Sequence, residues 1–151
     1  MRFLLVDRIC ELDPGKSIRA EKTFAASEEF FRDHFPNFPV VPGVLLTEVM
    51  AQAAGKCLDA ERHPRGKAML MEIKSARFRG WVRPDELMTT CATITTSREQ
   101  YATASCYLEV GGVRKCSAEI RAAFVPLTQL GAEFRDEVLE SFLASNKAAA
   151  K

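Results

Sequence analysis

The sequence predicts a single α+β domain in which one buried helix is wrapped by a long antiparallel sheet. Residues 44–60 are apolar nearly all round, which is typical of a buried helix rather than a surface helix. Between residues 69 and 125, apolar and polar residues alternate with a period of two, which indicates strands. Residues 132–144 return to a helical period, so the helices are expected on one face of the sheet.

Composition agrees with one ordinary globular domain. The chain has 151 residues, 47% of them hydrophobic and 27% charged, and its net charge of +1 gives no overall attraction to nucleic acid or a membrane. No apolar run has the length of a membrane span, and the N-terminus meets charged residues too early for a signal peptide. Five cysteines without CxxC spacing indicate reduced thiols, and only two histidines without ligand-like spacing argue against a metal site. Together these features predict a cytoplasmic protein, and no cofactor is expected.

The first third of the chain contains turn, strand and loop signals. Asp13-Pro14-Gly15-Lys16 predicts a turn, and the alternation over residues 17–24 predicts a weak strand. Ser27 has the residue type of an N-cap for a short helix over residues 28–32. Three prolines predict an extended, stiff loop over residues 35–42 before the buried helix.

The strands after the exposed polar loop at residues 61–66 have clear apolar faces. Met69, Met71 and Ile73 alternate with charged residues, and threonine-rich residues 87–97 favour a strand. Residues 101–110 and 113–125 alternate strictly, and their apolar faces match only if Leu108 pairs with Cys116. That pairing needs a three-residue loop or a bulge near residues 111–113.

Glu48 lies on the predicted buried helix among apolar residues. Its neighbours one turn away are Val44, Leu45, Ala51 and Gln52. An isolated carboxylate is costly to bury, and a carboxylic acid kept neutral by apolar surroundings can act as a general acid. Gln52 can hold the carboxyl group by a hydrogen bond. The alternative is an exposed or ion-paired glutamate, as most helical glutamates are.

His34 precedes the segment stiffened by Pro36, Pro39 and Pro42. A histidine held in fixed geometry suits a general base, although a lone histidine is more often structural. Gly43 follows Pro42 where the helix begins, and the unpaired N–H groups of a helix N-terminus can polarise a carbonyl oxygen. The alternative is that these two residues simply start a helix.

Taken together, the segment resembles the signature of the FabZ-type β-hydroxyacyl-[acyl-carrier-protein] dehydratases, which have the hotdog fold. The signature His-Phe-Pro-x-x-Pro-Val-x-Pro-Gly-Val-Leu-x-x-Glu-x-x-Ala-Gln is filled without a gap by residues 34–52. Residues 4–8, 12–16, 30–31 and 76–79 are similar to the family as well, so the resemblance covers roughly residues 3–125.

The resemblance implies dehydration of a (3R)-3-hydroxyacyl-[acyl-carrier-protein] to the trans-2-enoyl thioester, in fatty acid or related acyl-chain biosynthesis. It implies that His34 is the base that removes the C2 proton and Glu48 the acid that helps the C3 hydroxyl leave. Because aspartate usually holds that position in the isomerising FabA-type enzymes, Glu48 favours dehydration alone. In the family these two residues come from opposite subunits. The implied substrate-binding residues are Gly43, through its N–H, and Phe35, Pro42, Val44 and Gln52.

The resemblance also implies partners. Acyl carrier proteins are acidic, so a basic patch is expected, with Lys74, Arg77, Arg79 and Arg83 as candidates; an ordinary solvated strand face is the alternative. The expected assembly is a homodimer, possibly a trimer of dimers, without nucleic acid or membrane insertion. Candidate residues for an acyl tunnel at the dimer interface, equally suited to the core, are Phe35, Phe38, Val40, Leu45 and Phe78.

The expected organisation is a hotdog dehydratase domain over residues 1–126 and a helical extension over residues 127–151, packed on the same domain with a frayed end. The extension and Asp33, which stands where the family usually has glycine, depart from the family pattern. Two other functions stay open: a hotdog acyl thioesterase, and a non-catalytic hotdog protein that binds acyl chains or a partner.

Overall fold

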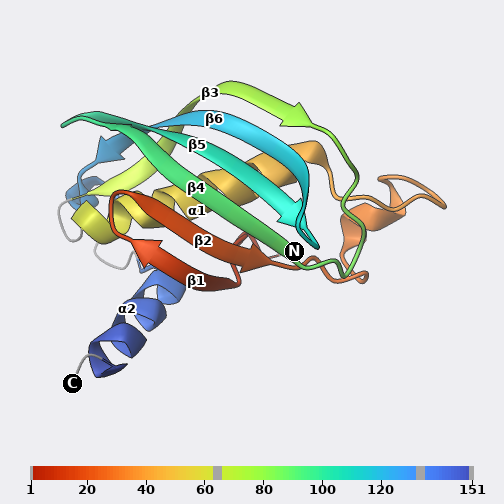
Figure 1. Ribbon diagram of the computed structural model, residues 1–151, viewed down its shortest axis with the longest axis horizontal. Coiled ribbons are helices and arrows are strands. Elements are labelled where there is room, and N and C mark those ends of the chain that lie inside the picture. The colour runs from red at the N-terminus through yellow and green to blue at the C-terminus, as the bar shows by residue number, and fades with distance from the viewer. Residues whose placement is uncertain (1, 63–65, 132–134, 150–151) are drawn as a thin grey trace.

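One sheet and one central helix dominate the structure (Figure 1). The computed structural model of the protein describes residues 2–62, 66–131 and 135–149. A six-stranded antiparallel sheet curves over helix α1 (Gly43–Arg62), and α1 contacts every strand from β2 to β6. The predicted α+β architecture of a helix wrapped by a sheet is therefore confirmed.

The strands have the order β1-β2-β4-β5-β6-β3 in the sheet, and every neighbouring pair is antiparallel. β3 is the last strand after β6, so among the described residues one of its edges has no partner strand within the sheet. The bounds are β1 Arg8–Asp13, β2 Ser17–Lys22, β3 Lys67–Phe78, β4 Met88–Ser97, β5 Tyr101–Val110 and β6 Val113–Val125.

Helix α1 fills the concave side of the sheet. It begins one residue earlier and ends two residues later than the expected range of 44–60. From Leu46 to Asp59 nearly every side chain is buried, and Met50 and Ala53 have no exposed surface. The predicted inward faces of β5 and β6 pack against it through Ala104, Cys106 and Ile120, so the apolar alternation of these strands builds the core.

The β5–β6 hairpin has the predicted pairing of Leu108 with Cys116. The turn itself is the two-residue Gly111-Gly112, both at positive φ, as a tight hairpin turn demands. The register shifts after Leu108, and the extra residue on β6 is Lys115. The bulge thus lies beyond the turn rather than at residues 111–113, and it brings the apolar faces of the two strands together.

The N-terminal region confirms the turn at residues 13–16, where the Lys16 N–H donates to the Asp13 carbonyl at 3.0 Å. This turn joins β2 to β1, a strand that the sequence patterns did not predict. The expected N-cap at Ser27 is wrong: η1 is a 3-10 helix over Glu29–Arg32, preceded by Glu28 without a side-chain cap. Such a short helix is held by its i→i+3 backbone bonds, so it needs no capping hydroxyl.

The proline-rich loop over residues 35–42 is less extended than expected. The N–H groups of Phe35 and Phe38 each donate to the carbonyl of the other, at 3.1 and 2.9 Å, and Asn37 has a φ of 62°. The loop therefore folds back on itself before it reaches α1. Asparagine is one of the few residues other than glycine that accept this left-handed conformation readily.

The C-terminal helix α2 runs over Glu137–Ala149, so it begins and ends later than the expected range of 132–144. The expected contact residue Phe134 lies outside the described residues. Leu139 is 3% exposed and belongs to the hydrophobic core. The partly buried side chains of Val138, Phe142 and Leu143 pack against that core. Within the described ranges, no helix combines the length and the apolar character needed to cross a membrane.

Candidate active site

His34 is fixed at the end of η1 by three hydrogen bonds. Its N–H donates to the Phe30 carbonyl at 3.0 Å, and its own carbonyl accepts from the Val40 N–H at 3.0 Å. The ring atom Nδ1 lies 3.0 Å from the Val40 carbonyl oxygen. A carbonyl oxygen only accepts, so Nδ1 carries the proton, and the neutral ring has its lone pair on Nε2. The ring, which also stacks on Phe35 at 4.1 Å, can thus act as a base through Nε2.

Glu48 lies in the second turn of α1 and is half-buried. Its Oε1 accepts a hydrogen bond from Gln52 Nε2 at 3.0 Å, as the spacing of four residues predicted. Gln52 is fixed in turn, because its Oε1 accepts from the backbone N–H of the fully buried Leu5 at 2.8 Å. The amide of Gln52 therefore cannot flip without losing both bonds, and the Glu48 carboxyl group is held in one orientation.

Gly43 begins α1 directly after Pro42. The first N–H groups of a helix have no acceptor within it, so they are available to an incoming carbonyl oxygen. A Cβ at Gly43 would lie 3.0–3.3 Å from three ring atoms of Phe78, so any other residue would displace that ring. Val44 is 75% exposed beside it. The helix start is thus open to a ligand on one side and closely packed on the other.

Glu48 and Gln52 line an open groove of about 520 Å³. The groove lies between α1, the start of β3, the N-terminal segment and residues just before α2. Its other lining residues are Phe3, Leu4, Ala51, Gly55, Lys56, Lys67, Ala68, Met69, Leu70, Arg135 and Asp136. His34 is absent from the described residues that line it, so a single chain brings together the acid and the groove but not the base.

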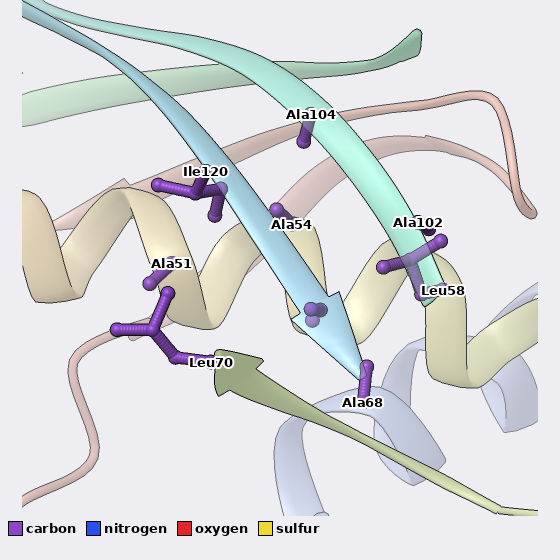
Figure 2. A pocket seen from close by; sticks show the side chains of 10 residues that line it. Ala51, Ala54, Leu58, Ala68, Leu70, Ala102, Ala104 and Ile120 are labelled. Carbon is purple, nitrogen blue, oxygen red and sulfur yellow. The ribbon is translucent and has the colours of Figure 1, made fainter. Parts of the chain in front are cut away.

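A small apolar cavity lies next to this groove, between α1 and the sheet (Figure 2). Its volume of about 20 Å³ holds no more than about one water molecule. Figure 2 shows its walls, which come from α1, β3, β5 and β6. The residues that line both spaces are Ala51, Gly55, Ala68 and Leu70. Small or apolar residues therefore lie between the groove and this cavity.

The candidate residues for the carrier protein differ in their surroundings. Lys74 pairs with Glu119 at 3.2 Å, and Arg79 donates to Ser117 Oγ at 3.4 Å. The guanidinium of Arg83 lies 4.2 Å from the ring centroid of Phe38, on the loop that carries His34. Arg77 is exposed on β3, as is Lys74. Arg83 is thus the candidate closest in structure to the His34 loop.

Sequence reasoning named Glu48 and Gln52 but none of the other residues that line this groove within one chain. None of the candidate tunnel residues Phe35, Phe38, Val40, Leu45 and Phe78 is among its described lining; Val40 is buried, whereas Phe35 and Phe78 are half exposed. The signal available was the spacing of Ala51 and Gly55 from Glu48, which places all three on neighbouring faces of one helix. The contributions of Phe3, Leu4 and Asp136 come from segments far apart in the chain, which no local pattern relates.

Comparison with known proteins gives consistent matches. Residues 1–119 match the family model described as a FabA-like domain. The chain is 41% identical over 119 residues to 3-hydroxyacyl-[acyl-carrier-protein] dehydratase FabZ of Levilactobacillus brevis, covering 78% of this chain and 80% of that protein. It is 40% identical over 128 residues to the FabZ dehydratase of Listeria innocua, covering 84% and 89%.

Solved structures agree on the fold. The dehydratase heterocomplex ApeI:P from Xenorhabdus doucetiae is similar with a TM-score of 0.68 at 14% identity, over 85% of this chain and 89% of that chain. A hypothetical thioesterase with coenzyme A from Streptococcus pneumoniae is similar with a TM-score of 0.63 at 10% identity, over 79% and 85%. At such low identity these similarities are evidence for the fold and not for the function. They confirm the predicted hotdog fold.

Proposed function

Because this chain belongs to the FabA-like family, with FabZ dehydratases as relatives, we propose that it converts a (3R)-3-hydroxyacyl thioester on acyl carrier protein into the trans-2-enoyl thioester and water. The reaction then belongs to fatty acid or related acyl-chain synthesis in the cytoplasm. The observation that carries the proposal is that the signature's base and acid are both present and each is held by a hydrogen bond, His34 to Val40 and Glu48 to Gln52.

Each residue has a defined role in the proposed step. The Nε2 lone pair of His34 takes the C2 proton, and the electron pair of that C–H bond forms the C2–C3 double bond. Glu48 gives its proton to the C3 hydroxyl, which leaves as water. The N–H at Gly43 binds the thioester oxygen, on which negative charge develops as C2 loses its proton. General acid–base assistance of this kind contributes about 10²–10⁴-fold per group.

In this proposal, a second subunit brings the base His34 close to the acid Glu48. Within one chain His34 does not line the groove that contains Glu48. β3 presents an unpaired edge together with exposed apolar side chains, including Met71 at 55% and Ile73 at 49% exposure. Such an edge is a template for pairing with another strand. We infer a homodimer joined along β3, in which His34 of one chain meets Glu48 of the other.

The acyl carrier protein then docks near the dimer's active sites. Arg83 and Phe38 place a cation and an aromatic ring beside the His34 loop, and Arg77, Arg79 and Lys74 extend positive charge along β3 and the segment that follows it. A basic surface there fits an acidic carrier protein and speeds encounter at low salt. The contact of Lys74 with Glu119 makes Lys74 the weakest of these candidates.

The proposal is tested with purified variants and 3-hydroxyacyl carrier-protein substrate. His34→Ala and Glu48→Gln are each expected to lower enoyl formation by about 10²–10⁴-fold. Matched controls are His63→Ala and Glu11→Gln, which are expected to retain full activity. Water loss supports the dehydratase, whereas release of free thiol without water loss supports a thioesterase. Full activity in either site variant contradicts the proposal.

A mixing experiment tests the shared site separately. When the two inactive variants are unfolded, mixed in equal amounts and refolded, half of the dimers contain one chain of each kind. Each mixed dimer has one intact His34–Glu48 pair, so about a quarter of the wild-type activity is expected to return. If no activity returns while mixed dimers form, base and acid belong to the same chain.

A further inference from the structure

The groove that contains Glu48 follows one face of α1 to a charged end. Glu48, Gln52 and Lys56 are spaced four residues apart, so they lie in a row along the helix. All three line the groove, together with Ala51 and Gly55. The part between Glu48 and Lys56 has small or apolar walls, apart from the amide of Gln52.

At the Lys56 end of this row, an ion pair joins α1 to Asp136, the residue just before α2. Lys56 Nζ lies 2.5 and 2.6 Å from the two carboxylate oxygens of Asp136, and the side chains are 5% and 12% exposed. Asp136 Oδ1 also accepts from the N–H of Leu139 at 3.1 Å, in the first turn of α2. Because Leu139 is anchored in the core, the carboxylate is fixed from two sides.

The length of this groove can be compared with an acyl chain. Eight residues of helix separate Glu48 from Lys56, which corresponds to about 12 Å. A fully extended chain of tetrahedral atoms advances about 1.2 Å per bond, as the extended backbone does, so about ten bonds fit between the two residues. With C3 of the substrate at Glu48, an acyl chain of about 12–14 carbons reaches the ion pair.

We propose that the Lys56–Asp136 ion pair is the end wall of the acyl groove and sets the longest chain that the enzyme accepts. This rests on the proposed dehydratase function. A terminal methyl group pressed against the pair removes its remaining contact with water and offers no hydrogen bond in return, which disfavours binding. Chains that end before the pair meet small and apolar walls, apart from the amide of Gln52. The C-terminal extension therefore acts on specificity, through Asp136.

The test measures kcat/KM for 3-hydroxyacyl carrier-protein substrates of increasing chain length, because each added methylene probes one further step along the groove. In the wild type, kcat/KM is expected to rise up to about fourfold per buried methylene and then to fall at least about tenfold beyond about 14 carbons. Apolar residues of similar size often replace a buried ion pair without loss of stability, so the variant is Lys56→Met with Asp136→Leu. Its length limit is expected to move upward by about two to four carbons.

The matched control is Lys16→Met with Asp13→Leu, which removes an exposed lysine–aspartate pair whose residues are not among those that line the groove. This control is expected to keep the wild-type length profile. A second variant, Gly55→Leu, covers the case in which the double variant fails to fold. A Cβ at Gly55 would lie 3.8 Å from its nearest neighbour, the carbonyl oxygen of Ala68, so a side chain fits there. A leucine in a helix points back toward the N-terminus, which here is over the groove floor. The longest acyl chain that Gly55→Leu accepts is expected to be shorter by about two to four carbons.

The outcomes separate this inference from the function on which it rests. If the wild type dehydrates no chain length, the proposed function fails. If it dehydrates short chains while the folded double variant and Gly55→Leu keep the wild-type limit, the end-wall role of the ion pair is refuted and the function stands. Opposite shifts in the two variants support the end wall.

Discussion

Gln52 is the residue whose replacement best tests how the site is built. Its side chain bonds both to the fully buried Leu5 N–H, at 2.8 Å, and to Glu48, at 3.0 Å. Leucine has nearly the same size but can make neither bond. The variant Gln52→Leu therefore removes these two hydrogen bonds, and also a longer, exposed one from Gln52 Nε2 to the Phe3 carbonyl at 3.5 Å, with little change in packing volume.

The expected loss of stability follows from the two partners. The Leu5 N–H is left buried without an acceptor, which costs about 1–3 kcal/mol, and the half-buried bond to Glu48 contributes about 0.5–1.5 kcal/mol. We expect the free energy of unfolding to fall by about 2–4 kcal/mol. For a chain of this length each kcal/mol lowers Tm by about 2–4 °C, so a decrease of about 5–15 °C is expected.

The expected loss of activity has a separate cause. Without Gln52 the Glu48 carboxyl group is free to rotate, and a catalytic group displaced by about 1 Å can cost 10²-fold in rate. We expect kcat to fall by about 10–100-fold at a temperature where the variant is fully folded. Thermal unfolding followed by circular dichroism gives Tm, and enoyl formation gives kcat.

The control for this variant is Gln129→Leu, the same substitution at an exposed glutamine in η2 (Leu127–Gln129). It is expected to change neither Tm nor kcat measurably. If Gln52→Leu loses stability but keeps wild-type kcat, then Gln52 supports the fold and does not orient Glu48. If it loses neither, the hydrogen bonds of Gln52 contribute nothing and the description of the site is wrong.

Two further predictions concern the core. Leu139→Ala is expected to lower the free energy of unfolding, measured in urea, by about 2–5 kcal/mol, because the side chain is 3% exposed. The control Leu87→Ala, at 52% exposure, is expected to change it by less than about 0.5 kcal/mol. Equal effects of the two substitutions contradict the packing of α2 on the domain. Burial raises the pKa of three thiols, to about 11 for Cys57 and about 12 for Cys106 and Cys116. The folded state then keeps protons that the unfolded state loses above about pH 8.5, so the free energy of unfolding is expected to fall between pH 9 and 11, by about 1.4 kcal/mol per pH unit for each thiol. Urea unfolding over this pH range should show a decrease per pH unit that is smaller by about 1.4 kcal/mol in Cys116→Ala, and an unchanged slope contradicts the assignment.

Much of the fold could be predicted because the information is local. The buried helix follows from the apolar run around Met50, and the inward faces of β5 and β6 follow from strict alternation. The pairing of Leu108 with Cys116 follows from matching those faces, although the position of the bulge at Lys115 does not. Alternation fixes which residues must face each other, but several bulge positions satisfy it equally.

Edge strand β3 shows where alternation misleads. Met69, Met71 and Ile73 read as the apolar face of a strand, yet each is between 43% and 55% exposed in the structure. Two register shifts with β6 interrupt the alternation, and in the part of the chain that the structure describes the outer edge of β3 has no neighbouring strand. The alternation of a sequence shows which residues share a face of a strand. It does not show whether that strand lies in the centre or at the edge of the sheet.

For the candidate site, the sequence by itself determined the residue types: a histidine, a glutamate and a glycine at the helix start, in the linear order that shows the family. Only the tertiary structure decided what surrounds them. It brings Leu5 to Gln52, and it brings Asp136 to Lys56 across 80 positions of the chain. The physical reason is that a motif is read along one continuous segment, whereas a groove forms where α1, β3 and both terminal segments pack on one another, and that packing is set by the burial of the whole core.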